Sequence, residues 1–169
     1  YRLVMGRSSH EKKIHDAAGK LLALYFSWQD FPEGCSFVTS PDLQQQVAVM
    51  KRPRGQAIEA HRHLPVPRAL AGTQEVLIIF SGEIRCEIYD EGAILVNKVL
   101  LRAGDCLVLV AGGHGFEITQ DAEFIEVKQG PYVAGRLCRD LRDAGVLEPD
   151  PDRRERERPK VWIVRKASP

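Results

Sequence analysis

The chain has 169 residues, 44% of them hydrophobic, and a formal net charge of +1 at pH 7, which suits one well-buried domain with a shorter segment left over. Lys and Arg residues form no basic stripe in the first 130 residues, so we expect no nucleic-acid partner. No run of about 18 apolar residues is present to span a membrane, so we expect no membrane partner. The N-terminus lacks the order of a secretory signal, which favours a cytoplasmic protein.

The first 51 residues predict one helix and two strands. Residues 8–18 are polar and tolerate a helix, with Ser8 or Ser9 as the N-cap. Residues 20–28 form an apolar run in which aromatic and branched side chains favour a strand. A further strand is expected at about residues 45–51, before the prolines and glycine that follow it.

The section from residue 75 to residue 129 reads as strand after strand. Clear alternation of polar and apolar residues in "EIRCEIY" and "EFIEVK" lets every second side chain face a core. Short strands at spacings of about 8 to 12 residues, with no helical period between them, indicate an all-β sandwich or barrel. The expected dividing turns are Ser81-Gly82, Asp90-Glu91-Gly92, Ala103-Gly104-Asp105, Gly112-Gly113 and Gln120-Asp121.

The composition changes after Pro131. Leu137, Leu141 and Val146 recur near helical spacing and predict one amphipathic helix. A charged, proline-containing stretch, "EPDPDRRERERPK", then has the composition of a solvated linker, and the terminal "VWIVRKASP" suits either an edge strand or a docking segment. We therefore divide the chain into an N-terminal arm (1–40), a barrel (41–132) and a C-terminal helix, linker and tail (133–169).

Four cysteines are scattered along the chain without a CxxC pair or zinc-finger spacing: Cys35, Cys86, Cys106 and Cys138. Cys86 and Cys106 lie in apolar, strand-like runs, where a free thiol behaves as a small hydrophobe. We expect all four to be structural thiols in a reducing compartment.

Two histidines one residue apart, His61 and His63, carry the strongest chemical signal. On a strand, residues i and i+2 point to the same side, so both imidazoles would converge if they faced inward. Nitrogen ligands in that arrangement suit a divalent ion, and a third histidine and a carboxylate from neighbouring strands would complete its ligands. His114, in "GGHGFEI", and Glu75, at the head of an apolar strand, are the candidates.

Residues 55 to about 129 resemble the cupin superfamily. The first cupin motif is Gly, five residues, His-x-His, a short gap, Glu, six residues and Gly; Gly55 precedes His61-Arg62-His63 by five residues, and Glu75 precedes Gly82 by six. Eleven residues separate His63 from Glu75, where cupins usually have three or four. The second motif is matched from Gly104 to His114, with Val110 in place of proline and one residue fewer before the histidine.

The resemblance implies a jelly-roll barrel that binds one divalent metal ion through His61, His63, Glu75 and His114. Zinc or iron is favoured over manganese or nickel. Arg68 lies on the inserted loop, where a guanidinium would hold an anionic group of the substrate. Lys128 shares a face with Glu126 on the last strand and would act there as an acid, a base or a charge partner. Together with Glu75, Arg68 and Lys128 are the candidate catalytic residues.

For function, we expect a metal-dependent enzyme acting on a small polar substrate, either anionic or carbohydrate-like. Isomerase, epimerase, dioxygenase and rearrangement chemistry all occur on this fold, and fold alone does not choose among them. One alternative is the zinc cupin unit of a fused hydrazine-forming synthetase. Another is a non-catalytic cupin that binds a ligand or regulates a partner. The arm and tail suit homodimer contacts that cover the edge strands of the barrel.

Overall fold

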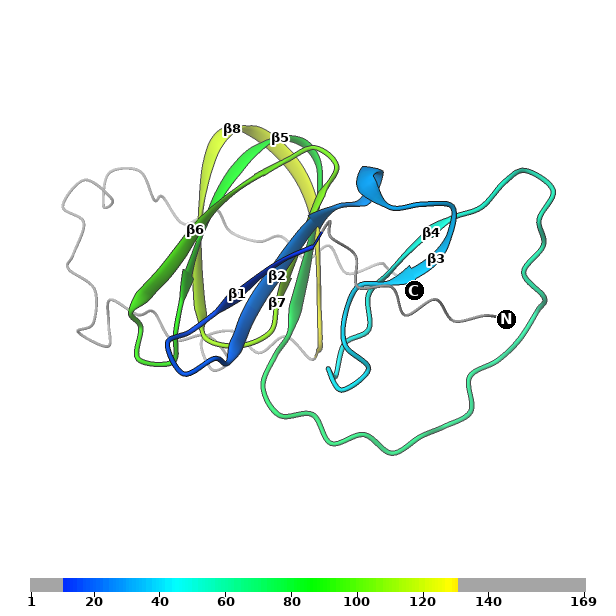
Figure 1. Cartoon of the computed structure of the whole chain (residues 1–169), viewed down its shortest axis with the longest axis horizontal. Coiled ribbons are helices and arrows are strands. Elements are labelled where there is room, and N and C mark those ends of the chain that lie inside the picture. Colours follow the sequence, from blue (N-terminus) through cyan, green and yellow to red (C-terminus); the bar gives the residue numbers. More distant parts are fainter. Residues whose placement is uncertain (1–10, 131–169) are drawn as a thin grey trace, which may run out of the picture. The chain divides into compact units, whose positions relative to one another are not determined.

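A computed structural model describes residues 11–130 of the chain. This part is built from antiparallel strands, which confirms the prediction of a β protein (Figure 1). None of its helices is long and apolar enough to cross a membrane. The elements are β1 (Lys12–His15), β2 (Leu21–Ser27), the 3-10 helix η1 (Trp28–Asp30), β3 (Gly34–Phe37), β4 (Ala48–Lys51), β5 (Glu75–Tyr89), β6 (Leu95–Arg102), β7 (Asp105–Leu109) and β8 (Gly113–Lys128).

One six-stranded sheet contains every strand except β3 and β4, which form a hairpin of their own. The long strand β5 organises this sheet. One of its edges pairs first with β7, through residues 75–78, and then with β6, through residues 83–89. The other edge pairs with β8 over nearly its whole length. The strand order is therefore β1-β2-β7-β5-β6, with β8 on the opposite side of β5.

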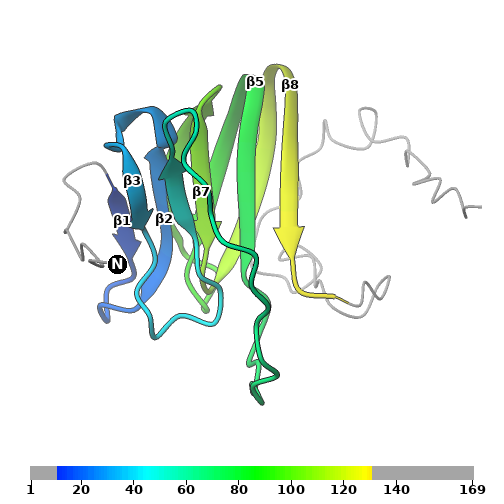
Figure 2. The same ribbon diagram turned by 90° about the vertical axis from the view of Figure 1, so that its right-hand side faces the viewer.

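The sheet folds back on itself because β5 and β8 bend together, as an arch, at Gly82 and Asp121 (Figures 1 and 2). Gly82 has φ of 77°, in the left-handed region that favours glycine. A Cβ atom at this position would lie 2.0 Å from the Asp121 carbonyl oxygen. The lack of a side chain at Gly82 thus lets the two strands cross the bend in close contact.

The bend divides the sheet into two layers that face each other. The first layer holds β1, β2, β7 and the halves of β5 and β8 next to them, and the second holds β6 and the other halves. Between the layers lies the main hydrophobic core, which draws side chains from five strands. Its members are Ile14, Leu22, Ala23, Leu77, Ile79, Ile84, Cys86, Ile88, Val99, Leu101, Leu107 and Leu109.

A second core covers the outer face of the first layer. There the β3–β4 hairpin and its flanks pack Val38, Val47 and Val49 against Leu24 and Val108. The first layer is therefore apolar on both faces, which explains why β7 reads as a continuous hydrophobic run and not as an alternating one.

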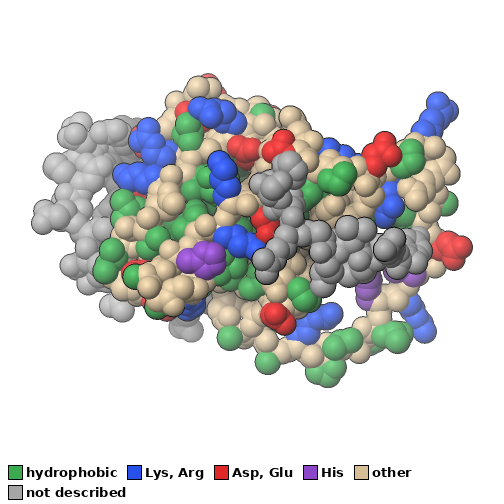
Figure 3. All heavy atoms as spheres, viewed as in Figure 1, with side chains coloured by type: hydrophobic (Ala, Val, Ile, Leu, Met, Phe, Trp, Pro, Cys, Tyr) green, Lys and Arg blue, Asp and Glu red, His purple; other side chains and the backbone are tan. Residues whose placement is uncertain are grey.

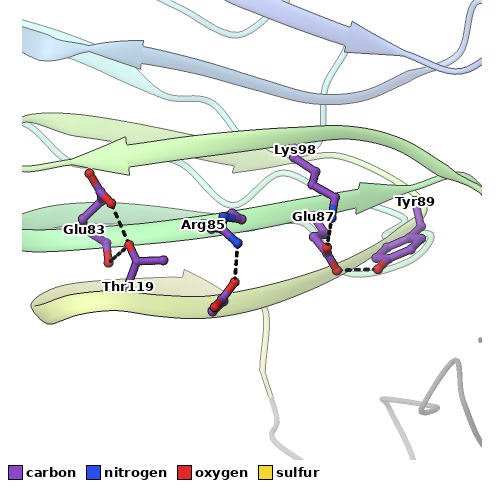
Figure 4. A network of polar contacts seen from close by, with 7 residues as sticks. Glu83, Arg85, Glu87, Tyr89, Lys98 and Thr119 are labelled. Carbon is purple, nitrogen blue, oxygen red and sulfur yellow. Dashed lines mark hydrogen bonds and ion pairs between the residues drawn. The ribbon is translucent and has the colours of Figure 1, made fainter. Parts of the chain in front are cut away.

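The outer face of the second layer is polar. Alternation along β5 turns Ile84, Cys86 and Ile88 into the core and leaves the intervening side chains outside, where they pair across to β6 and β8 (Figure 4). The Lys98 ammonium lowers the pKa of the Glu87 carboxyl. The contacts on this face are Arg102–Glu83, Thr119–Glu83, Arg85–Glu117, Lys98–Glu87 and Tyr89–Glu87.

Two predictions near the N-terminus meet different outcomes. The strand at 20–28 is confirmed as β2, whereas within the helix expected at 8–18 the structure has the strand β1. The cause is tertiary: β1 pairs with β2 and buries Ile14 in the main core, and Lys12 lies over the Tyr25 ring. Both strands belong to the main sheet, although they lie in the segment expected to form an arm.

Several other expectations concern chain breaks and ends. Ser81-Gly82 and Gln120-Asp121 are bends within β5 and β8, not ends of strands. The strand expected at 45–51 is shorter, as β4, and its partner β3 was not predicted. The predicted C-terminal helix, linker and tail lie outside the described residues.

Among the described residues, the ladder of paired strands does not close into a barrel. β8 hydrogen-bonds to β5 only, so its other edge has no strand beside it in residues 11–130. The residues between β4 and β5 (52–74) form no strand, and those from 52 to 73 are exposed. The sheet is thus a folded, open one, and a long loop joins the separate β3–β4 hairpin to β5.

The arch predicts a large difference between two glycine substitutions. Gly82→Ala should lower the free energy of unfolding by about 3 kcal/mol or more, because the new methyl group meets the Asp121 carbonyl. Gly19→Ala is the matched control, since Gly19 has a similar φ of 82° but open space around it. It should cost only about 1–2 kcal/mol. Urea unfolding measures both; equal losses would contradict a tight approach at the arch.

Candidate functional site

Three of the predicted site residues meet at the end of the fold opposite the arch. Glu75 begins β5 in the first layer, and its Oε2 atom lies 3.3 Å from Nε2 of His114, which belongs to the second layer. The Lys128 Nζ atom lies 3.6 Å from Glu75 Oε1 and also forms an ion pair with Glu126. We call these four residues the open-end cluster. The bend in β5 and β8 assembles it, because it brings His114 of the second layer back to the other three residues.

Glu75 is held in place by the residue before it. Gln74 is buried, and its side-chain oxygen accepts a hydrogen bond of 2.9 Å from the Gln45 backbone N–H. The Gln74 backbone N–H donates to Oε1 of Gln129, just beyond β8, also at 2.9 Å. These bonds fix the end of the 52–74 loop, so that β5 starts with the Glu75 side chain on the same face as Leu77.

His114 owes its position to the glycines before it. Gly112 has φ of 76°, and a Cβ atom there would lie 2.2 Å from the Tyr89 carbonyl oxygen. This close approach lets the chain leave β7 and pair at once with the far half of β5, where His114 lies opposite Ile88. The imidazole then faces inward, with the Phe116 ring 5.1 Å away between centroids.

The electrostatics of the cluster leave one negative charge. Glu75 is 7% exposed, and its Oε2 atom accepts no hydrogen bond from the described residues. Burial lowers the pKa of His114 below its usual 6.5, and the charge of Glu75 opposes this shift only in part. With His114 neutral, the two carboxylates face the single ammonium of Lys128. A buried carboxylate oxygen that accepts no hydrogen bond, in a cluster with a net negative charge, favours binding of a cation.

Glu75 and His114 fit as two ligands of one metal ion. Two donors about 2.1 Å from a tetrahedral ion lie about 3.4 Å apart, close to the separation of Glu75 Oε2 and His114 Nε2. A neutral imidazole and a carboxylate are both suitable donors for zinc or iron. Within residues 11–130, however, no group of three or more His, Cys, Asp and Glu side chains is placed to hold a metal.

The other predicted residues lie on the 52–74 loop. His61, His63 and Arg68 are exposed there, and the His61 Nδ1 atom contacts the Glu59 carbonyl oxygen at 2.8 Å. Figure 3 shows the loop as a separate arc that carries hydrophobic, basic and histidine side chains. His61 and His63 were expected on a strand, but residues 52–74 form no strand in this structure. The two rings contact each other instead, 5.3 Å apart.

Gln74 and Gln129 are contributors that the sequence did not reveal. A glutamine beside a predicted ligand carries no chemical signal, and the pairing of residues 74 and 129 follows only from strand register. Glu126 was noticeable through its alternation with Lys128. Its inward direction follows from its position opposite the buried Leu77.

The described cysteines take no part in the open-end cluster. Cys86 and Cys106 are buried and unbridged, and Cys35 is partly buried. Burial raises the pKa of Cys86 to about 12 and that of Cys106 to about 11. Both thiols are therefore protonated and unreactive near neutral pH, in line with the structural role expected for them.

Comparisons with protein-family models, with curated proteins and with solved structures find no match to this chain.

The charges around His114 predict opposite effects of two substitutions in metal-free protein. Glu75→Gln removes a negative charge, so the pKa of His114 should fall further; Lys128→Met removes a positive charge, so it should rise. Imidazole chemical shifts followed against pH by NMR measure both, with the exposed His15 as an internal control. Unchanged His114 titration in both variants would contradict the arrangement.

The same lowered pKa has a consequence for stability. Because the unfolded chain takes up a proton on this histidine more readily than the folded one, folding should lose stability as the pH falls below 6.5. His114→Gln should remove that part of the pH dependence, measured by urea unfolding between pH 5 and pH 8. If the variant and the parent protein showed the same pH dependence of stability, the contribution assigned to His114 would be contradicted.

Proposed function

We propose that this chain is a metal-dependent cupin enzyme that acts on a small, anionic substrate at the open-end cluster. In this proposal the metal ligands are Glu75 and His114 together with His61 and His63 from the 52–74 loop. The observation that carries it is the pair formed by Glu75 and His114. Glu75 matches the first cupin motif and His114 the second. The two residues come from opposite layers and lie at the separation of two ligands on one ion.

The loop histidines reach the cluster if the loop adds a strand to the free edge of β8. Within residues 11–130 that edge of β8 pairs with no strand, so it is open to one. The eleven residues from Leu64 to Gln74 span up to about 40 Å when extended, enough to cross a small domain. Such a strand would complete the jelly roll and turn His61 and His63 toward His114.

A bound divalent ion would supply Lewis acidity or activate water or dioxygen at this end of the fold. The protein's own residues have separate roles. Glu75 and His114 offer a buried oxygen and a neutral nitrogen, and the layers behind them exclude water from the core side. Lys128 is placed to give a proton to a bound group or to balance its charge. Arg68, on the loop, would hold the anionic end of the substrate.

A second candidate is a non-catalytic ligand-binding protein. The observation in its favour is the Lys128 ammonium, which already balances Glu75 without any metal. In that case the open-end cluster would bind a polar group directly through hydrogen bonds and charge. Elemental analysis separates the two candidates.

Metal content tests the proposed function. The purified protein, or the protein dialysed against zinc, iron, manganese or nickel, should hold about one ion per chain. His114→Ala and His61→Ala should each weaken metal binding by at least about tenfold, because each removes a ligand. His15→Ala is the matched control, since His15 is an exposed histidine on β1. Failure of the parent protein to bind any of these metals would refute the enzyme proposal.

A further inference from the structure

The inward face of β8 carries three partly exposed apolar side chains, with ionisable residues at both ends of the strand. Register places Phe116 opposite Cys86, Ile118 opposite Ile84, and Phe124 opposite Ile79. Because opposite residues of antiparallel strands point to the same side, all three face the space between the layers. Their β5 partners are fully buried, yet Phe116, Ile118 and Phe124 remain 37%, 50% and 38% exposed.

Ionisable groups flank this apolar set at the end away from the arch. His114 precedes Phe116 on the same face, and Glu126 and Lys128 follow Phe124 on it. Since β8 bends at Asp121, its two halves lie in facing layers, and the same bend brings His114 to Glu75. We call the set of Phe116, Ile118 and Phe124 the inner apolar row. Among residues 11–130, a molecule on the inward face of β8 would meet charge at the open end and the apolar side chains of β5 and β8 toward the arch.

We propose that the substrate of this site has an apolar body, aromatic or branched, attached to one small anionic head such as a 2-oxo acid. This inference rests on the proposed function and narrows its substrate class. The head would lie at the open-end cluster, where a divalent ion turns the net charge of the described groups from one negative to one positive. The body would cover the inner apolar row.

The row disfavours a substrate with many hydroxyl groups. Each hydroxyl taken from water needs a hydrogen-bond partner to avoid a penalty. Toward the arch, the inward side chains of β5 and β8 are Ile79, Ile84, Cys86, Phe116, Ile118 and Phe124. Only the thiol among them carries a polar hydrogen, and burial holds it in its neutral form. An apolar body needs no such partners and gains by leaving water.

The test compares two 2-oxo acids that share a head and differ in body: benzoylformate, which carries a phenyl ring, and pyruvate, which carries a methyl group. Titration calorimetry on the metal-loaded protein should give at least a tenfold preference for benzoylformate, consistent with burial of a ring on apolar side chains. Phe116→Ala and Phe124→Ala should reduce this preference to about threefold or less, and the metal content of each variant is measured alongside.

Ile125→Ala is the matched control. Ile125 is next to Phe124 on β8 and similarly exposed, but it lies opposite Ile78 on the other face of the sheet. It should leave the preference unchanged. Equal affinity for the two acids, no binding of either, or tighter binding of glucose 1-phosphate would overturn the inference.

The two proposals fail separately. Metal content is measured first, and its absence refutes the enzyme proposal. The same acids are then titrated into the metal-free protein, where Lys128 is the cation left in the cluster for the head, and the ratio of their affinities still decides whether the inner apolar row selects an apolar body.

Discussion

The close approach of the paired strands β5 and β8 at their shared bend, at Gly82 and Asp121, is the constraint on which the rest of the structure depends. A backbone approach of this kind leaves no room for a side chain, so two strands of 15 and 16 residues bend together and the sheet folds into two facing layers. The core is the space between those layers. The meeting of Glu75 with His114 at the other end is a second result of the same bend.

The open-end cluster combines features that a purely structural ion pair would not need. Glu75 keeps a buried oxygen that accepts no hydrogen bond from residues 11–130, and burial disfavours the charged form of His114. Burial without full pairing costs free energy, and such groups are concentrated at functional sites. The polar face of the second layer differs in this respect, because its charged side chains pair across strands and most of them stay one third or more exposed. Those pairs contribute little individually.

How far the site follows from the sequence differs from residue to residue. Glu75, His114 and Lys128 were predicted from motif spacing and alternation, and the structure brings these three together. His61 and His63 came from the same motif, but the prolines and the eleven intervening residues let the 52–74 loop run outside the sheet. Local pattern cannot say where such a loop rests, because its position depends on which strand edge it joins. The helix predicted at residues 8–18 is wrong for a related reason: pairing with β2 overrode the helical preference of the residues that form β1.

The sequence by itself determined the β character of the chain, the alternation that buries Ile84, Cys86 and Ile88, and the identities of the ionisable residues at the site. These are local properties, set by the two-residue period of a strand and by side-chain chemistry. Only the tertiary structure decided that Ser81-Gly82 is a bend and not a strand end, that β8 keeps a free edge in the described part, and that an apolar row adjoins the charged cluster. Each of these depends on pairing between residues far apart in the chain, which no local pattern encodes.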